Sequence, residues 1–463
     1  MAQRREVLTA LGLGAVGAHL HPQVFSLCGA FQKKNKTPKK PNIVFILADD
    51  LGWSDLSCYG GRFYETPNLD DFAQTGVRFT DAYASCPVCS PTRASVMTGK
   101  YPARFNITDW IPGMKAKNRK LITPQDLQEL PLDEVTFAER LKESGYKTFF
   151  AGKWHLGGEG FYPQDQGFDI NKGGYHKGGP RGGYYSPYKN PALDDGPDGE
   201  YLTDRLTDES IKFMEANKNT PFVLCLSFYT VHTPIQACNR HHLKFPKKKA
   251  EKMHGEDKSP FRRERRGVTK MRQDNPSYAS MVHAMDENIG RLLAKLEKLG
   301  LDDNTAVIFT SDNGSLSTRA ATNAPTSNLP LRAGKGWCYE GGIRVPAIMR
   351  LPGVTKPNST CRAPITSTDF YPTFLDLAGL PQNPKQHADG LSLIPLFDKK
   401  VKTLARNAIY WHYPHYHGST WTPGAAIRYG DWKLIEFYEE GEAELYNLAS
   451  DIGESKDLSD AYP

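Results

Sequence analysis

The sequence contains few cysteines and no long apolar run. Eight cysteines in 463 residues are too sparse for a fold held together by disulfides, although the number still permits one or two bridges. Beyond the start of the chain, no apolar segment is long enough to cross a bilayer, so we expect no transmembrane span. Apolar residues make up 39% and charged residues 24%, which excludes a wholly disordered chain and predicts a sizeable folded core.

Outside one segment, the sequence has almost no excess of either positive or negative charge. The net charge is +6, but residues 244–272 contain twelve Lys or Arg and only four acidic residues. The rest of the chain is therefore close to neutral. Because the segment lacks interleaved aromatic side chains and a known nucleic-acid-binding motif, we expect no nucleic-acid partner. It either attracts an acidic polymer or forms a solvated insertion.

The first 32 residues have the composition of a signal peptide. Arg4 and Arg5 precede an apolar stretch from Val7 to Ala18 that is too short to span a bilayer. Two adjacent arginines before a weakly hydrophobic stretch favour the twin-arginine export route. A lipoprotein signal at Cys28 is disfavoured by the bulky residue before it, and a disordered arm is the other alternative. Together with a Lys/Pro-rich linker at 33–40, this start predicts a periplasmic or secreted protein.

Alternating strand and helix patterns predict an α/β fold. The continuous apolar, β-rich run at Asn42–Ala48 is typical of a buried parallel strand. Further strands are expected at 77–79, 148–151, 221–228 and 306–310, and helices at 69–75, 135–144 and 280–299. Such alternation produces right-handed crossovers and a mainly parallel sheet with helices on both faces. We therefore predict a large domain of this kind over 41–400.

The end of the chain follows a different pattern. From Ala408 onward, short β-type segments are separated by turns, which predicts a small antiparallel sheet. A Pro- and Lys-containing stretch at 383–402 precedes it, so we expect a second, smaller domain at 404–463. A Gly/Tyr/Pro-rich stretch at 157–199 has little periodicity and is expected to be an ordered surface loop near a site.

Two predicted strands end in oxygen-rich pairs. Asp49-Asp50 follows the first strand, and Asp312-Asn313 follows the strand at 306–310. Functional groups of open parallel sheets gather at the carboxyl edge. Three carboxylates and an amide there would repel one another without a cation, and an all-oxygen set suits Ca²⁺ or Mg²⁺ better than zinc. The alternative is that these residues act in turns and helix caps.

The segment Cys86-Pro87-Val88-Cys89 allows several interpretations. Ser90 can cap a helix and Pro91 suits the first helical turn, so the two cysteines could form a redox pair at a helix start. A zinc site would need a second such pair, which the sequence lacks. Two small core residues, or a disulfide, are the remaining alternatives.

The run CSPTRASVMTG, from Cys89 to Gly99, resembles the signature of the type I sulfatases: Cys or Ser, then x-Pro-x-Arg, a short spacer and Thr-Gly. The similarity continues in the family's order through GKWHLG (152–157), VHTP (231–234), SDNG (311–314), GKGWCYEGGIRVP (334–346), AAIRYGDWKLIEF and ELYNL. The chain looks most similar to bacterial arylsulfatase A-like and N-acetylgalactosamine-sulfatase-like enzymes. The resemblance implies an alkaline-phosphatase-like fold and hydrolysis of sulfate esters.

The resemblance also implies a modified nucleophile. In the family, a formylglycine-generating enzyme oxidises the cysteine at the position of Cys89 to formylglycine, an aldehyde whose hydrate attacks sulfur. A separate argument agrees, because a soft thiolate is a poor partner for a hard, oxygen-ligated cation. The cation, Ca²⁺ in most of the family, would be held by Asp49, Asp50, Cys89 in its modified form, Asp312 and Asn313.

Further roles follow from the resemblance. Arg93 and Lys153 would neutralise the nucleophile and the sulfate charge. Lys335 and His232 would face the leaving oxygen, where a donor is needed as the S–O bond breaks. His155 would take a proton from the second hydroxyl of residue 89 and so expel sulfate. Lys153, His232 and Lys335 would therefore also bind substrate.

Histidines near the C-terminus are candidates for choosing the substrate. The segment WHYPHYHG contains His412, His415 and His417 and resembles a metal cluster, but in the family it leans over the pocket. We expect sugar contacts from one or two of these residues, with His412 and His415 as the candidates, and surface positions otherwise. His176 is a weaker candidate. The basic segment 244–272 could attract a sulfated polysaccharide.

Two other functions are compatible with the sequence. Sulfate and phosphate esters share a shape, so a phosphomonoester or phosphonate hydrolase of the same superfamily is one alternative. The Cys-type signature together with His155 and His232 favours sulfate. The other alternative is a non-catalytic protein that binds sulfated glycans and leaves Cys89 unmodified.

Overall fold

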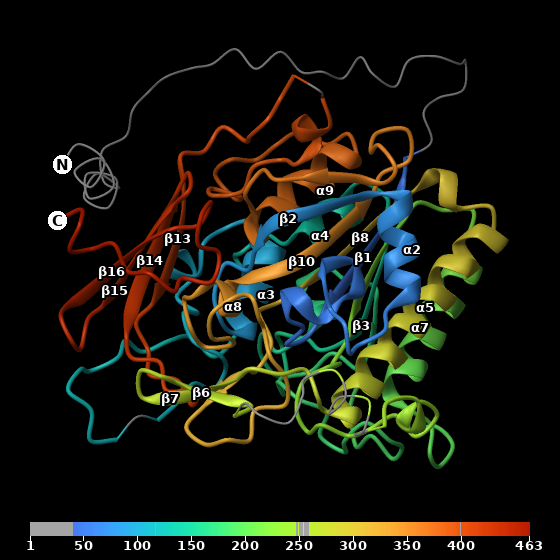
Figure 1. Ribbon diagram of the computed structural model, residues 1–463. Coiled ribbons are helices and arrows are strands. Elements are labelled where there is room, and N and C mark those ends of the chain that lie inside the picture. Colours follow the sequence, from blue (N-terminus) through green and yellow to red (C-terminus); the bar gives the residue numbers. More distant parts are fainter. Residues whose placement is uncertain (1–39, 116, 247–248, 250–252, 254–258, 399) are drawn as a thin grey trace.

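The computed structural model describes residues 40–463, except 116, 247–248, 250–252, 254–258 and 399. The expected signal peptide at 1–32 and residues 33–39 of the linker lie outside the described residues. The chain forms a central, mostly parallel sheet between two layers of helices, and an antiparallel sheet near its C-terminus (Figure 1). The predicted fold class is confirmed. Within the described part, no helix has the length and apolar character needed to cross a membrane.

The central sheet has nine strands, in the order β11-β2-β10-β8-β1-β5-β3-β4, with β12 paired to β2. Only β10 runs antiparallel to its neighbours, β2 and β8. The strand β1 is buried along its whole length at the middle of the sheet, as a continuous apolar run predicts. The strands are β1 (Asn42–Ala48), β2 (Val77–Tyr83), β3 (Lys147–Gly152), β4 (Ile170–Lys172), β5 (Phe222–Ser227), β8 (Thr305–Ser311), β10 (Arg344–Arg350), β11 (Ser359–Cys361) and β12 (Ile365–Thr366).

Alternate residues of β1 face two separate apolar cores. Val44 and Ile46 belong to the core beneath one layer of helices, whereas Ile43 and Phe45 belong to the core beneath the other. Both faces are therefore dry, and polar groups can gather only where the strands end. The first layer contains α2 (Pro67–Thr75), α5 (Leu202–Ala216) and α7 (Pro276–Lys298), and the second contains α3 (Cys89–Thr98), α4 (Phe137–Glu143) and α9 (Phe370–Leu377).

The C-terminal sheet consists of four consecutive antiparallel strands, as predicted. They are β13 (Ala408–Tyr413), β14 (Gly424–Tyr429), β15 (Trp432–Phe437) and β16 (Glu442–Asn447). Its inner face packs on the larger sheet's loops through aromatic rings, among them Trp421 against Trp337. A small third sheet is formed by β6 (Phe261–Glu264), β7 (Gly267–Lys270) and β9 (Thr318–Arg319).

A buried ion cluster joins the C-terminal sheet to the rest of the protein. The Lys433 ammonium, on β15, lies 2.8 Å from Glu340 of the short helix α8 (Glu340–Ile343) and 2.7 Å from Glu454 in the tail. All three side chains are fully buried. Burial alone would lower the pKa of Lys433, but Glu340 and Glu454 raise it, so the ammonium stays charged.

We expect Lys433→Ala to lower the free energy of unfolding by about 3–5 kcal/mol, because it leaves the buried Glu454 without its cation and leaves Glu340 with Arg344 alone. Urea denaturation, with a probe in the C-terminal sheet, measures this change. Lys456→Ala, which removes an exposed lysine from the same tail, should change it by less than about 0.5 kcal/mol. Equal effects of the two substitutions would show that the buried cluster does not hold the sheet in place.

Candidate active site

The register of two central strands brings the two oxygen-rich pairs together. Ala48 at the end of β1 pairs with Ser311 at the end of β8, so the residues that follow each strand emerge side by side. The backbone N–H of Asp50 donates to Asp312 Oδ1 over 3.1 Å. Both pairs, Asp49-Asp50 and Asp312-Asn313, are almost completely buried. Three carboxyl groups and an amide therefore share one small volume at the carboxyl edge of the sheet.

Each of these carboxyl groups has a cationic partner. Arg93 Nε donates to Asp312 Oδ2 over 2.8 Å, and its Nη1 donates to the Lys153 carbonyl and to Ser227. The Lys153 ammonium lies 2.8 Å from both oxygens of Asp49. The Lys335 ammonium lies 2.7 and 2.9 Å from the two oxygens of Asp50. Three side chains that the sequence assigned to sulfate binding thus gather around the predicted metal ligands.

Burial and these cations shift the pKa values of the carboxyl groups in opposite directions. For Asp49, burial outweighs Lys153 and raises the pKa. For Asp50, burial acts in the same sense, but Lys335 overcomes it and the pKa is lowered. Arg93 likewise lowers the pKa of Asp312 against the effect of burial. Asp50 and Asp312 are therefore anionic at neutral pH and can hold a cation.

Residue 89 lies at the N-terminal end of α3, directly beside this cluster. Cys89 is 2% exposed, and its Sγ lies 3.3 Å from His155 Nδ1. Arg93 follows one helical turn later, which places both side chains on the same face of α3. All seven cysteines within 40–463 are free, so the disulfide interpretation of Cys86 and Cys89 is wrong. Burial raises the pKa of the Cys86 thiol well above its ordinary value, which does not suit a redox partner.

The hydrogen bonds of His155 define which ring nitrogen carries the proton. Its Nε2 contacts the carbonyl oxygen of Ile111, which can only accept, so Nε2 is protonated and Nδ1 presents a lone pair to Cys89. Burial, reinforced by Lys153, lowers the pKa of His155 well below its ordinary value. The neutral ring can therefore accept a proton from residue 89. Gly178 of the 157–199 loop packs on this ring, where an added Cβ would lie 2.4 Å from Cε1.

His232 presents an acceptor, not a donor, to the cluster. Its Nδ1 lies 2.8 Å from the Thr233 carbonyl and donates to it, which leaves a lone pair on Nε2 at 3.8 Å from Asp50 Oδ2. Burial and the Lys335 ammonium lower the pKa of His232 to about 3, so the ring is neutral. Donation from His232 to a leaving oxygen would require a second proton. Lys335, whose pKa Asp50 raises in spite of burial, has donors available at neutral pH.

The cluster fits a hard divalent cation. Asn313 Oδ1 is a buried oxygen without a hydrogen-bond partner among the described residues. Asp49, Asp50 and His232 each offer a ligand atom, and these three atoms lie within 4.8 Å of one another. Anionic oxygens beside an unpaired amide oxygen are the ligands that Ca²⁺ and Mg²⁺ prefer. Both oxygens of Asp312 already have partners, as do those of Asp49 and Asp50, so a cation would share these carboxylates with the neighbouring donors.

Comparison with known proteins agrees with this chemistry. The sulfatase family model matches residues 41–380, and a model of the N-sulphoglucosamine sulphohydrolase C-terminal region matches residues 333–462. The chain belongs to the sulfatase family. It is therefore a sulfuric ester hydrolase by family, as the signature at Cys89 predicted.

Individual relatives are similar over most of their length. A sulfatase of Formosa agariphila is 31% identical, with 93% of this chain and 87% of the relative covered. The N-acetylgalactosamine-6-sulfatase of Mus musculus is 32% identical, and the match covers 98% of this chain and 79% of the relative. Among solved structures, that of Ps i-CgsB in complex with k-i-k-neocarrahexaose is 31% identical, with a TM-score of 0.75 and 91% and 89% of the two chains covered.

The predicted substrate histidines of this sulfatase lie in different surroundings. His412 is exposed on β13, where its Nδ1 lies 3.4 Å from the Tyr438 hydroxyl, and His176 is exposed in the 157–199 loop. His415 is buried, and its Nε2 lies 2.8 Å from Thr108 Oγ1. A buried, hydrogen-bonded ring of this kind holds the loop around Thr108 to the C-terminal sheet. His415 is therefore better placed to support the pocket than to contact a sugar.

His417, which was not among the preferred candidates, lies against Gly336, the neighbour of Lys335 in the chain. Its Nδ1 accepts from the backbone N–H of Ser419 over 3.1 Å, so the proton is on Nε2. An added Cβ at Gly336 would lie 2.0 Å from its ring, and Gly336 follows Lys335. Burial and then Lys335 lower the pKa of His417 to about 3. In the sequence, the second glycine of the GKGW motif is the signal that could have indicated this contact, because a glycine permits close approach by another segment.

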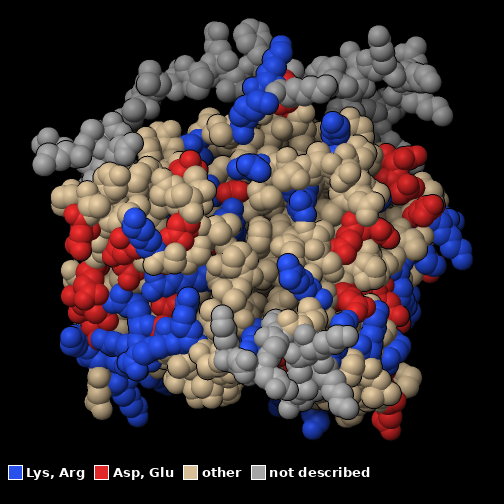
Figure 2. All heavy atoms as spheres, in the orientation of Figure 1, with Lys and Arg blue, Asp and Glu red and all other residues tan. Residues whose placement is uncertain are grey.

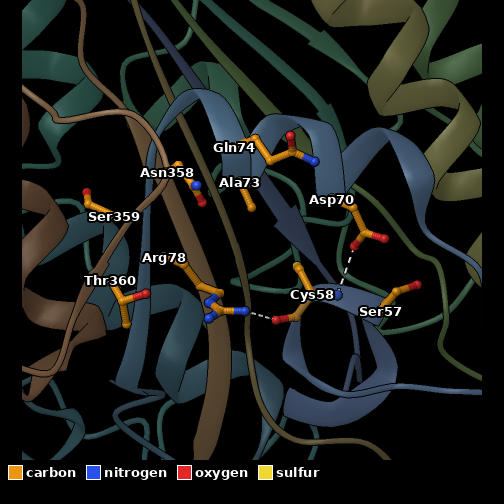
Figure 3. A pocket seen from close by; sticks show the side chains of 9 residues that line it. All are labelled: Ser57, Cys58, Asp70, Ala73, Gln74, Arg78, Asn358, Ser359 and Thr360. Atoms are coloured by element: carbon orange, nitrogen blue, oxygen red, sulfur yellow. Dashed lines mark hydrogen bonds between the residues drawn. The ribbon is translucent and has the colours of Figure 1, made fainter.

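A surface hollow of about 300 Å³ lies elsewhere on this sulfatase and lacks catalytic groups (Figure 3). It lies near the first residues of β2, whereas the active-site groups follow the last residues of β1, β5 and β8. Cys58 is the only thiol among its lining residues, and burial raises the pKa of this thiol to about 12, so it is not a nucleophile. The residues drawn around it are Ser57, Cys58, Asp70, Ala73, Gln74, Arg78, Asn358, Ser359 and Thr360.

Proposed function

We propose that this sulfatase hydrolyses sulfate esters of a sugar or polysaccharide, using formylglycine made from Cys89 and a bound Ca²⁺ or Mg²⁺ ion. The observation that carries the proposal is the lone pair of His155 Nδ1, aimed at residue 89 from 3.3 Å beside the carboxylate cluster. The relatives support the substrate class, since one acts on N-acetylgalactosamine 6-sulfate by its name and another binds a neocarrahexaose.

The proposed mechanism assigns one task to each side chain. A hydrated aldehyde at position 89 would supply an oxygen nucleophile, which a thiol does not. Arg93 and Lys153 neutralise negative charge on the sulfate, an effect that is large in a dry pocket. His155 accepts a proton at Nδ1, and Lys335 donates one to the leaving oxygen. Asp49, Asp50, Asp312 and Asn313 would hold the cation next to the sulfate.

Burial of Cys89 supports a modification early in biosynthesis. A formylglycine-generating enzyme cannot reach a side chain that is 2% exposed, so conversion must precede folding of α3. We further propose that the protein is exported by the twin-arginine signal at its start, a route that carries folded proteins. Conversion would then take place before export, and the active enzyme would work in the periplasm or outside the cell.

Ca²⁺ should raise the melting temperature of the metal-free protein, because a ligand that binds only the folded state adds about 2.7 kcal/mol at 100 times its Kd. Asn313→Ala should increase the Ca²⁺ concentration needed for half of this shift by about 10–100-fold, the range seen when a metal site loses a supporting group. Asn288→Ala, at a buried asparagine of α7, is the control and should leave that concentration unchanged. Identical Ca²⁺ dependence in both variants would show that Asn313 does not bind the cation.

The reaction class is tested with a matched pair of aryl esters. The purified enzyme should have a higher kcat/KM for 4-nitrophenyl sulfate than for 4-nitrophenyl phosphate, because the chain belongs to the sulfatase family and its Cys-type signature with His155 and His232 favours sulfate. A higher value for the phosphate would favour the phosphomonoester or phosphonate hydrolase. Binding of a sulfated sugar without hydrolysis of either ester would favour the non-catalytic alternative.

A further inference from the structure

Four exposed cations lie close together in one loop of the sulfatase. Lys115, Lys117, Arg119 and Lys120 are all exposed, and residues 113–125 contain no acidic residue. None of the four forms an ion pair with any residue that the structure describes. Figure 2 shows Lys and Arg side chains gathered at the lower left, where Figure 1 places this loop beside β6 and β7. We refer to these four residues as the basic surface.

The basic segment 244–272, which the sequence favoured for polyanion binding, has largely lost its free charge. Its described cations pair with acidic side chains that are distant in the sequence, as well as with close neighbours. The pairs are Lys244 and Lys249 with Glu65, Arg262 with Glu264, Arg265 with Glu442 and Glu444, Arg266 with Glu439 and Glu440, and Lys270 with Asp274. The four cations of the basic surface are therefore unpaired among the described residues, whereas most of the described cations of segment 244–272 form ion pairs.

The loop that carries the basic surface begins in the active site. The carbonyl of Ile111 accepts the hydrogen bond from His155 Nε2, and Lys115 follows only four residues later. Between them, the Met114 N–H donates to Asp109 Oδ2 over 3.2 Å, which turns the chain outward. The basic surface therefore follows an active-site contact within a few residues of the chain.

Contacts with the C-terminal sheet hold the basic surface in place. The Arg119 guanidinium lies 5.0 Å from the centre of the Tyr416 ring, and the Leu121 N–H donates to the Tyr416 hydroxyl. Tyr416 adjoins His417, which packs beside Lys335 at the pocket. These contacts restrain the side of the loop that carries Arg119, and a restrained group loses less entropy on binding.

We propose that the basic surface binds anionic groups of the same polysaccharide whose sulfate ester occupies the active site. This inference rests on the proposed function and narrows it to a substrate with negative charges beyond the reacting sugar. A polysaccharide is favoured over an acidic protein because the loop that carries the surface also carries Ile111, whose carbonyl contacts His155 beside the proposed sulfate site. Exposed charges act over roughly one Debye length, about 10 Å at 0.1 M salt, so the effect depends on ionic strength.

The test compares two variants that each lose four exposed cations. One is Lys115→Ser, Lys117→Ser, Arg119→Gln and Lys120→Ser combined. The control is Lys147→Ser, Lys218→Ser, Lys298→Ser and Lys356→Ser combined, all exposed and without an ion pair among the described residues. Dextran sulfate serves as the polyanion and competes with 4-nitrophenyl sulfate, while unsulfated dextran serves as the blank.

In the basic-surface variant, the inhibition constant of dextran sulfate should rise about tenfold, the effect of losing four weak surface attractions. Its kcat/KM for 4-nitrophenyl sulfate should stay within about twofold of the wild-type value, since an aryl ester does not reach the loop. Raising the salt concentration should weaken inhibition of the wild type more than that of this variant. An unchanged inhibition constant, or an equal rise in the control variant, would overturn the proposal.

Failure of the proposed function would give a different result. If the wild type hydrolyses no sulfate ester, direct titration with fluorescently labelled dextran sulfate still compares the two variants. Weaker binding by the basic-surface variant alone would then support the surface while rejecting the enzyme activity. Equal binding by the wild type and both variants would reject the surface.

Discussion

Cys89→Ala is expected to abolish sulfate ester hydrolysis, with kcat lower by about 10⁴–10⁶-fold, the range found when an enzyme loses its nucleophile. The side chain is small and buried, so the fold should survive, and circular dichroism with thermal melting verifies this. The loss arises because no other group at the N-terminal end of α3 can attack sulfur from the position of residue 89. Release of 4-nitrophenol from its sulfate ester is the measurement.

The neighbouring cysteine provides the matched control. Cys86→Ala removes an equally buried thiol three residues earlier and should leave kcat within about tenfold of the wild-type value. Under the redox interpretation both cysteines are needed, so both variants would fail equally. Activity retained by Cys89→Ala would contradict the assignment of residue 89 as the source of the nucleophile.

His155→Gln should lower kcat/KM by about 10²–10⁴-fold, the usual contribution of a positioned general base. The amide keeps a donor for the Ile111 carbonyl but cannot accept a proton at the position of Nδ1. As a control, His387→Gln changes a buried histidine whose ring packs on Tyr371, and it should leave kcat/KM nearly unchanged. A similar loss in both variants would indicate a packing effect and not proton transfer.

The pH profile tests the proton-accepting role of His155 in a second way. Because burial and Lys153 lower the pKa of His155 well below its ordinary value, the ring remains neutral and basic below pH 6.5. The acid limb of the wild-type kcat/KM profile should therefore lie below pH 6.5, and activity should fall only as His155 becomes protonated. In His155→Gln this limb should disappear. A wild-type midpoint near or above pH 6.5 would contradict the role given to this ring.

The sequence predicted the parts of the fold that depend on regular patterns. Apolar runs identified β1, β5 and β8, and the polar pairs after β1 and β8 marked the edge where the site lies. Helix α5 was not identified, because its buried face includes Thr203, Thr207 and Ser210 and so lacks an unbroken apolar stripe. Such polar residues are buried only because their hydroxyl groups find backbone or side-chain partners, which a pattern does not reveal.

Details of the site depended on contacts between distant segments. A backbone carbonyl, that of Ile111, sets the tautomer of His155, and a backbone group carries no sequence signal. His415 and His417 are two residues apart, yet one supports a loop and the other lies beside Lys335. The charge of Arg265 in segment 244–272 is neutralised by Glu442 and Glu444, which follow it by 177 and 179 residues. Only the folded chain brings these partners together.

The central claim is that Cys89 becomes formylglycine, and mass spectrometry of one peptide tests it directly. Trypsin cleavage after Arg78 and Arg93 releases residues 79–93, which contain both Cys86 and Cys89. In protein made by a host that has a formylglycine-generating enzyme, fragment ions should show that residue 89 has lost its sulfur and gained an aldehyde oxygen, while Cys86 is unchanged. Finding only cysteine at both positions in such protein would contradict the account.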